Sequence, residues 1–190
     1  MRWVPFVILV YLVIVVQTTL GRLLTFPNTA IGPVGPDLAA IVAVFLALRL
    51  RDGVELGLAA WVLGLAVDLT SGVGSEFGGA VGPMALAYAL AAVVIFRMRE
   101  AMFRERPVVQ VLLALIFCLL AHGTWVSIQT VALGSGQRSW ARYWGTLKQA
   151  GALAVYTAAL TPIGCWALGK FARFLIAVQA GRARPSRARR

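Results

Sequence analysis

Six long apolar stretches, separated by short polar segments, make up most of the chain. Because a helix needs about 20 apolar residues to cross a bilayer, this pattern predicts an all-α integral membrane protein with six transmembrane helices. The second and third stretches are short by that measure, so either their ends extend into the flanking loops or they form a re-entrant hairpin. The stretches cover Val4–Leu20, Leu38–Leu50, Val54–Leu69, Val81–Phe96, Val108–Leu133 and Ala150–Leu168.

Composition agrees with this pattern, since 60% of the 190 residues are hydrophobic and only 13% are charged. A soluble domain of this size cannot bury so much apolar surface. The first stretch resembles a signal peptide, but no small-x-small cleavage pattern precedes the polar segment Gln17–Arg22, so we expect a retained helix. We expect one six-helix domain over residues 1–180 and a disordered basic cytoplasmic tail over 181–190, which is too polar to fold alone.

The basic residues are unevenly divided between the two sides that six helices would define. Fourteen Lys and Arg lie on the side of the termini and four, namely Arg22, Arg138, Arg142 and Lys148, on the other. The positive-inside rule therefore predicts cytoplasmic N and C termini. The net charge of +11 is mainly a topology signal, and nucleic-acid binding is disfavoured because no basic segment accompanies a nucleic-acid-binding fold pattern. For the tail, we expect contact with anionic lipid, with docking of an acidic cytoplasmic partner as the alternative.

Residues capable of catalysis or metal binding are few. The chain has one His and two Cys, and both Cys118 and Cys165 lie inside apolar stretches. This leaves too few ligands for a Cys/His metal site, and no Gly-rich phosphate loop or Ser–His–acid set can be assigned. We therefore predict a protein that is not an enzyme and has no cofactor or metal.

His122 is the one ionisable side chain in the middle of the fifth stretch. Cys118, Trp125 and Gln129 share its helix face at i−4, i+3 and i+7. Ionisable residues inside membranes are candidates for function, which makes His122 and Gln129 candidate site residues. The alternative is a neutral imidazole hydrogen-bonded to a neighbouring helix.

Two acids, Asp37 and Asp68, are expected near the outer surface. Asp37 follows Pro36 and opens the second apolar stretch, so it is expected to cap the free amides of a helix N-terminus. Asp68 ends the third stretch, where a carboxylate meets the negative end of the helix dipole. A cation, a hydrogen-bond network or water must offset this cost, and we predict a polar cluster at the outer mouth of the bundle.

The last outer loop carries an amphipathic pattern. Trp140, Tyr143, Trp144 and Leu147 fall at i, i+3, i+4 and i+7, which predicts a short helix lying on the outer leaflet. Trp140 and Trp144 belong either to an ordinary interfacial aromatic belt or to a partner-binding surface. Further on, Pro162 is expected to kink the last helix.

Three motifs follow one another between Pro33 and Tyr88. The first is Gly35-Pro36-Asp37-Leu38, which opens an apolar helix that ends with Phe45-Leu46-Ala47-Leu48-Arg49. The second is Gly57 with Gly64-Leu65-Ala66-Val67-Asp68-Leu69-Thr70-Ser71-Gly72, and the third is Gly82-Pro83-Met84-Ala85-Leu86-Ala87-Tyr88. In order and spacing, the first two resemble the MreD family of rod shape-determining membrane proteins. The segment from Val73 to Val81 is longer than the family's usual link, so the resemblance is to a divergent member.

The resemblance implies a fold similar to the substrate-binding S components of energy-coupling-factor transporters, in the bacterial inner membrane. It further implies a non-enzymatic scaffold of the cell-elongation (Rod) complex. Such a scaffold binds the single-span protein MreC and links MreB filaments to the RodA glycosyltransferase and its transpeptidase. The matching positions that become candidate functional residues, without an assigned ligand, are Pro36, Asp37, Asp68, Ser71 and Gly72.

A substrate-binding membrane subunit of a small-molecule (vitamin) transporter is the alternative function. It predicts a closed pocket at the outer end, lined by Asp68, His122, Trp125 and Gln129. Recognition of a polar vitamin needs several convergent hydrogen-bonding groups, and the sequence offers few. The scaffold interpretation is therefore preferred, with the transporter subunit kept open.

Overall fold

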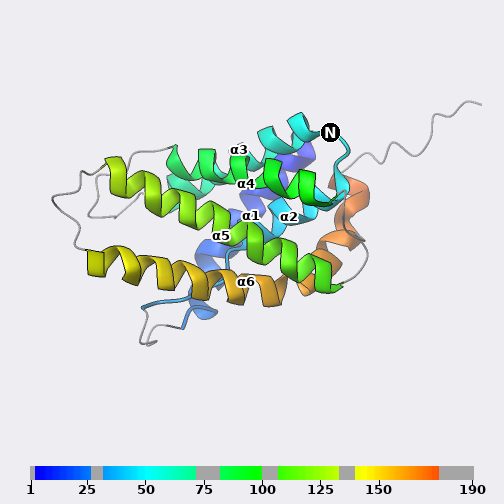
Figure 1. Cartoon of the computed structure of the whole chain (residues 1–190). Helices are drawn as coiled ribbons and strands as arrows, with labels where there is room; N and C mark the ends of the chain where they lie inside the picture. The colour runs from blue at the N-terminus through cyan, green and yellow to red at the C-terminus, as the bar shows by residue number, and fades with distance from the viewer. Residues whose placement is uncertain (1–2, 27–31, 72–81, 100–106, 133–139, 176–190) are drawn as a thin grey trace, which may run out of the picture.

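The structure is a computed structural model that describes residues 3–26, 32–71, 82–99, 107–132 and 140–175. These residues form six helices, and the part of the chain described contains no strand beyond an isolated bridge between Phe26 and Val34 (Figure 1). The predicted all-α class is confirmed. The helices are α1 Trp3–Leu23, α2 Leu38–Arg49, α3 Gly53–Ser71, α4 Pro83–Met98, α5 Pro107–Ala132 and α6 Trp140–Leu175.

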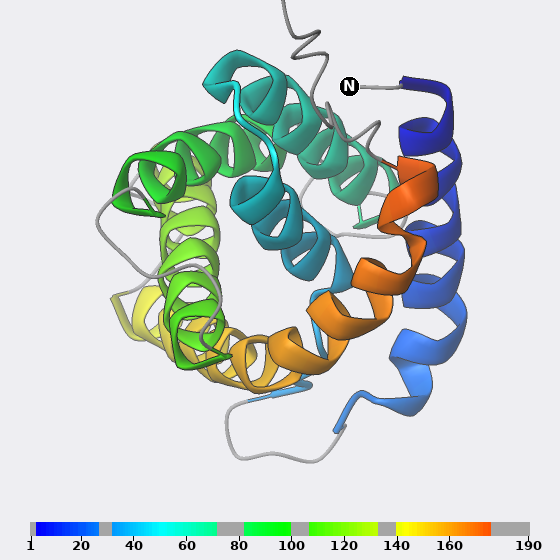
Figure 2. The same cartoon turned by 90° about the vertical axis from the view of Figure 1, so that its right-hand side faces the viewer.

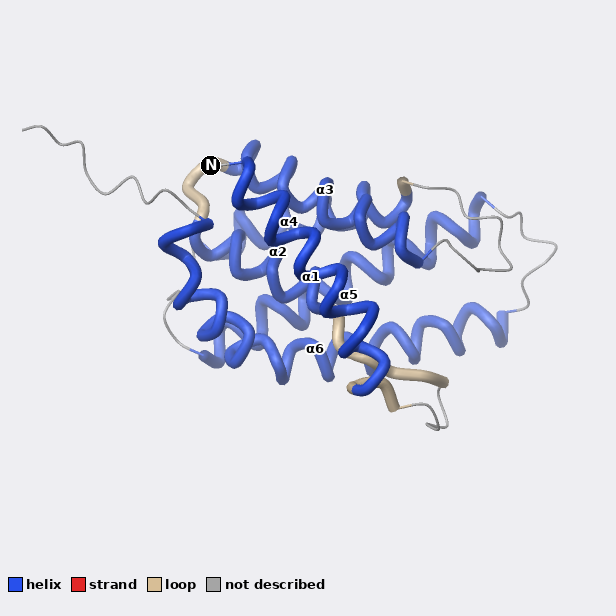
Figure 3. Tube along the Cα trace, turned by 180° about the vertical axis from the view of Figure 1, so that it is seen from behind, coloured by secondary structure: helices blue, strands red, loops and turns tan. Residues whose placement is uncertain are grey.

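The shortest of these helices, α2, lies at the centre of the bundle. The other helices surround it, as the view along the bundle shows (Figure 2), and all residues from Ala39 to Ala47 are buried. The many alanines of α2 allow its neighbours to approach closely. Around it, α3 packs along α4 and α5 along α6, while α1 crosses the back of the bundle (Figure 3).

Three helices are long and apolar enough to cross a membrane, over Gly53–Thr70, Pro107–Thr130 and Tyr143–Lys170. Shorter apolar helices cover Phe6–Thr19, Leu38–Arg49 and Pro83–Met98. Large apolar side chains also point outward, and α1 alone exposes Val4, Val7, Ile8, Tyr11, Leu12 and Val15. Soluble proteins rarely expose apolar patches of this extent, so these features indicate a membrane protein.

The last helix differs from its expected form. We expected a separate amphipathic helix at Trp140 and a transmembrane helix from Ala150, but α6 runs without a break from Trp140 to Leu175. The separate helix was wrong because the helical spacing of Trp140–Leu147 continues into the apolar stretch, and neither Gly145 nor Gly151 ends the helix. Pro162 lies inside α6, and the helix changes direction towards its orange end (Figure 1).

The close contact between α3 and α4 depends on Gly64. A Cβ atom at this position would lie 2.6 Å from the carbonyl oxygen of Met84 and 2.7 Å from the Cα of Ala85. Both are backbone atoms, so they cannot move aside without shifting the whole helix. Gly57, two turns earlier in α3, would meet nothing within 4 Å.

We expect Gly64→Ala to lower the free energy of unfolding by about 1–3 kcal/mol, because the added methyl group separates two packed backbones. Gly57→Ala is the matched control, and it should be neutral or slightly stabilising because alanine favours the helix. Thermal unfolding of the purified variants in mild detergent measures both. Equal melting temperatures for the two variants would contradict the packing described.

Candidate functional site

The amino end of α2 is capped inside the bundle. Asp37 has an extended backbone, and its Oδ1 accepts a hydrogen bond from the amide of Ala40 at 3.1 Å. Its own amide donates to Thr157 Oγ1 of α6 at 3.0 Å, and the amide of Ala39 donates to Gln17 Oε1 of α1 at 3.3 Å. The predicted N-cap role of Asp37 is confirmed, and two further helices contribute to the cap.

The second carboxylate oxygen of Asp37 connects α2 to α4 and α5. The Tyr88 hydroxyl donates to Oδ2, and His122 Nε2 lies 3.2 Å from the same atom. Because an ionised carboxylate only accepts, Nε2 carries the proton in this arrangement. Asp37, Tyr88, His122 and Thr157 are called here the Asp37 network, and it joins α2, α4, α5 and α6.

The Asp37 network is buried. Asp37 is 4% exposed, and Tyr88 and Thr157 are fully buried. The carboxylate of Asp37 is enclosed by α4, α5 and α6, because α2 is short and central. Its expected place near the outer side of the membrane stays a prediction. His122 contacts Asp37 at the start of α2. This agrees with the alternative interpretation of His122, in which its imidazole is hydrogen-bonded to a neighbouring helix.

Asp68 caps a helix other than its own. Its Oδ2 accepts from the amides of Gly82 at 2.9 Å, Met84 at 3.0 Å and Ala85 at 3.3 Å, all at the start of α4. Gly82 has a φ of 129°, a conformation that glycine adopts without strain. The positive amino end of α4 therefore compensates for the position of Asp68 at the carboxyl end of α3.

The outer-side arginines available to Asp68 and several other candidate residues fall outside the described part of the chain. This applies to Gly72 and Arg138, and to the side chains of Ser71, Arg22, Arg142 and Trp140. The basic tail over 181–190 also lies outside it.

The remaining candidates are spread through the bundle. Pro36 is buried directly before the Asp37 network, and Gln129 is half-buried two turns beyond His122 on α5. Trp144 is 52% exposed. The structure thus brings Pro36, Asp37 and His122 together, links Asp68 to them through α4, and leaves Trp144 apart.

Sequence reasoning missed Gln17 as a cap of α2 and three further residues that bind other helices. Tyr88 was noted only as part of a motif, and Thr157 was not noted. Arg99, counted only as a topology signal, is 3% exposed, and its Nη1 donates to the carbonyl oxygens of Ala47 and Leu50 at the end of α2. Thr157 could have been found from the sequence. It lies four residues before Thr161, so two hydroxyl groups share one face of an apolar helix, which indicates a polar contact with a neighbouring helix.

Comparison of the chain with protein-family models, with curated proteins and with solved structures found no match. What the site can do therefore follows from its own geometry. The buried Asp37 network joins four helices, and one carboxylate oxygen of Asp68 accepts hydrogen bonds from three amides at the start of α4. Among the described residues, no three or more His, Cys, Asp or Glu side chains are grouped so that they could hold a metal ion.

We expect Asp37→Ala to lower the free energy of unfolding by about 3 kcal/mol, because it leaves buried partners of the carboxylate without an acceptor. Asp37→Asn should recover much of this loss, since asparagine also caps helices. The matched control is Asp52→Ala, which removes an exposed cap on Val54 and should cost about 1 kcal/mol. Thermal unfolding in detergent compares the three variants, and equal losses for Asp37→Ala and Asp52→Ala would argue against the network.

Replacing Asp68 should loosen the first turn of α4. In Asp68→Ala the amides of Gly82, Met84 and Ala85 lose their acceptor, so their hydrogen exchange should accelerate. The control is Thr70→Val, which removes only a local hydroxyl bond to Ala66 and Val67 on α3. Exchange measured by mass spectrometry should change at the start of α4 in the first variant and remain unchanged there in the second. An Asp68→Ala protein indistinguishable from the parent would also end the candidacy of Asp68 as a functional residue.

Proposed function

We propose that the chain is a divergent MreD-like scaffold of the bacterial cell-elongation complex. In this proposal all six helices are embedded in the inner membrane, with both termini in the cytoplasm and a fold similar to energy-coupling-factor S components. The protein binds an MreC-like single-span protein and connects MreB filaments to the RodA glycosyltransferase and its transpeptidase. It performs no catalysis of its own.

The observation that carries this proposal is that the three motifs of the resemblance contact one another. Asp37 of the first motif accepts a hydrogen bond from Tyr88 of the third. Asp68 of the second motif caps the helix that the third motif opens, and Gly64 of the second lies against Met84 of the third. Separate pieces of sequence that resemble one family therefore form a single connected unit, as expected if they are inherited together.

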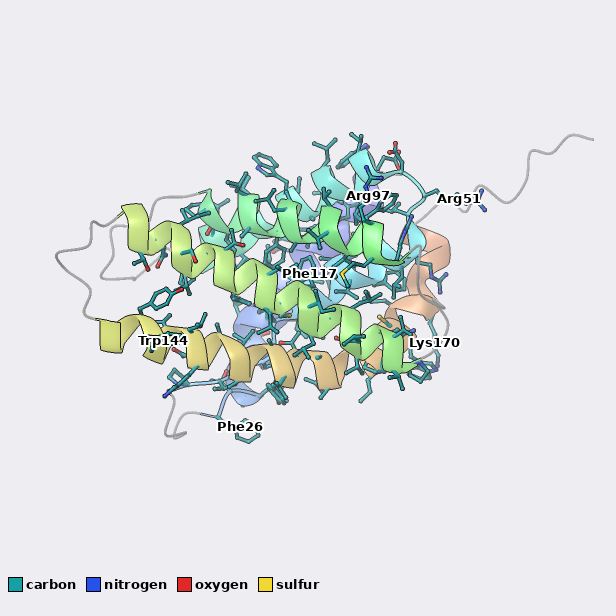
Figure 4. All side chains as sticks on the ribbon, in the orientation of Figure 1. Phe26, Arg51, Arg97, Phe117, Trp144 and Lys170 are labelled. Atoms are coloured by element: carbon teal, nitrogen blue, oxygen red, sulfur yellow. The ribbon has the colours of Figure 1, made fainter. Side chains whose placement is uncertain are left out.

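The distribution of charge supports the proposed orientation. Arg51, Arg97 and Lys170 lie at one end of the bundle, and Trp144 lies at the opposite end (Figure 4). Since cytoplasmic loops carry the excess of Lys and Arg, the end with Arg51 faces the cytoplasm in this proposal. A scaffold that meets cytoplasmic filaments needs its basic loops on that side.

The transporter alternative requires polar groups that are available to a ligand. Two of those it would use, Asp68 and His122, already have partners inside the protein. These bonds leave fewer polar atoms to recognise a vitamin, which favours the scaffold over the transporter subunit.

Purification of the full chain from its native membrane tests the proposal. With a tag on the N-terminus and a mild detergent, we expect an MreC-like single-span protein and the RodA-type synthase to be recovered, as identified by mass spectrometry. Depletion of the chain should also convert rod-shaped cells to spheres. An unrelated tagged multi-span protein from the same membranes is the control for non-specific recovery. Recovery of transporter ATPase subunits, with cell shape unchanged after depletion, would replace the scaffold by the transporter alternative.

A further inference from the structure

Arg51, Arg97 and Lys170 lie at one end of the bundle (Figure 4), and Lys170 lines a groove there. It has a volume of about 850 Å³ and is formed by the end of α2, the start of α5 and the second half of α6. This volume lies in the range of small-molecule sites, about 300–1,000 Å³. The groove is separate from the Asp37 network, and neither the resemblance nor the proposed scaffold role accounts for it.

Two cations line the groove, and aromatic rings support both. The Lys170 Nζ lies 3.9 Å from the ring centroid of Trp166, and the Arg49 guanidinium lies 5.2 Å from that of Phe45. Within the described part of the chain, neither cation forms an ion pair with a carboxylate. A ring occupies only one face of a cation, so the N–H donors of both residues remain able to bind an anion.

Arg49 is directed into the groove by its surroundings. Its Nη2 would lie only 3.7 Å from a Cβ atom at Gly169, so the guanidinium of α2 extends over α6 where α6 has no side chain. An arginine at the end of a helix commonly binds the last carbonyl groups. Here Arg99 donates to the carbonyls of Ala47 and Leu50 instead.

The rest of the groove is largely apolar. Pro162, Cys165 and Trp166 of α6 form one wall, and the Trp166 side chain is 65% exposed. A free phosphate ion would use the two cations and Gln110, the other polar side chain of the lining, and would leave this wall uncovered. A ligand with an anionic head and a hydrocarbon tail matches both parts, and basic pockets between membrane helices are known to bind anionic head groups.

We propose that this groove binds one anionic phospholipid, with its phosphate between Arg49 and Lys170 and an acyl chain along Pro162 and Trp166. The inference requires only that the chain lies in a bilayer, so it stands or falls independently of the proposed scaffold function. It also differs from contact between lipid and the basic tail, because the ligand here occupies a defined position.

Native mass spectrometry of the full chain tests the site. The protein is released from micelles that contain either phosphatidylglycerol or phosphatidylcholine with the same acyl chains, and the number of retained lipids is counted. We expect the parent chain to retain one phosphatidylglycerol in preference to phosphatidylcholine. Arg49→Gln with Lys170→Gln should reduce that retention roughly tenfold or more, as expected for the loss of two cations at an anionic head group.

The matched control is Arg51→Gln with Arg97→Gln, which removes the same charge from exposed residues at the same end. It should retain phosphatidylglycerol like the parent. If the first double variant unfolds, the single variants Lys170→Gln and Trp166→Ala replace it, because both change exposed side chains. Their retention of phosphatidylglycerol is compared with that of the parent in the same way.

Three results would overturn the inference. They are equal loss of lipid in both double variants, no preference of the parent for phosphatidylglycerol, and displacement of the lipid by inorganic phosphate. The last result would identify a free-phosphate site.

Discussion

The ends of a short helix placed at the centre of the bundle determine much of this structure. Every helix leaves amides free at its start and carbonyls free at its end, and burying them without partners is costly. The amino end of α2 is buried, and so are Ala47 and Leu50 near its carboxyl end, so the bundle must supply polar partners for their backbone groups from its other helices. Asp37, Gln17 and Thr157 satisfy the amino end, and Arg99 satisfies the carboxyl end. The neighbouring helices are therefore tied to one position relative to α2.

The same constraint explains where the acids lie. Asp37 and Asp68 both accept hydrogen bonds from backbone amides at the start of a helix. Asp37 caps its own helix, α2, whereas Asp68 belongs to α3 and caps the next helix, α4. This arrangement is feasible because Gly64 brings α3 against the backbone of Met84 and Ala85. One carboxylate thereby stabilises the junction of two helices, and Tyr88, one turn further along α4, joins that junction to the Asp37 network.

Helix positions and the Asp37 cap could be predicted because they depend on local sequence. Apolar runs defined the six helices, and Pro36-Asp37 before such a run marked an N-terminus. The cap made by Asp68 could not be predicted, because it depends on which helix packs beside α3. Arg99 was missed for a similar reason. A basic residue at the end of an apolar helix is interpreted first as a sign of the cytoplasmic side, and its buried contacts with α2 depend on which helices pack together. The early start of α6 was missed because Arg142 and Lys148 lower the local hydropathy without interrupting the helix.

Asp37 and Asp68, the two acids that carry the resemblance, lie inside the protein, so they cannot themselves contact a large partner. Their effect on any partner is indirect: they fix the relative positions of the surrounding helices and hence of the surfaces that face lipid. The exposed apolar side chains of α1 and the groove at Arg49 and Lys170 are such surfaces. α1 contacts the central helix, and α2 and α6 supply both cations of the groove. A scaffold of the proposed kind requires this rigidity, because it can align several membrane proteins only if its own surfaces keep a constant geometry.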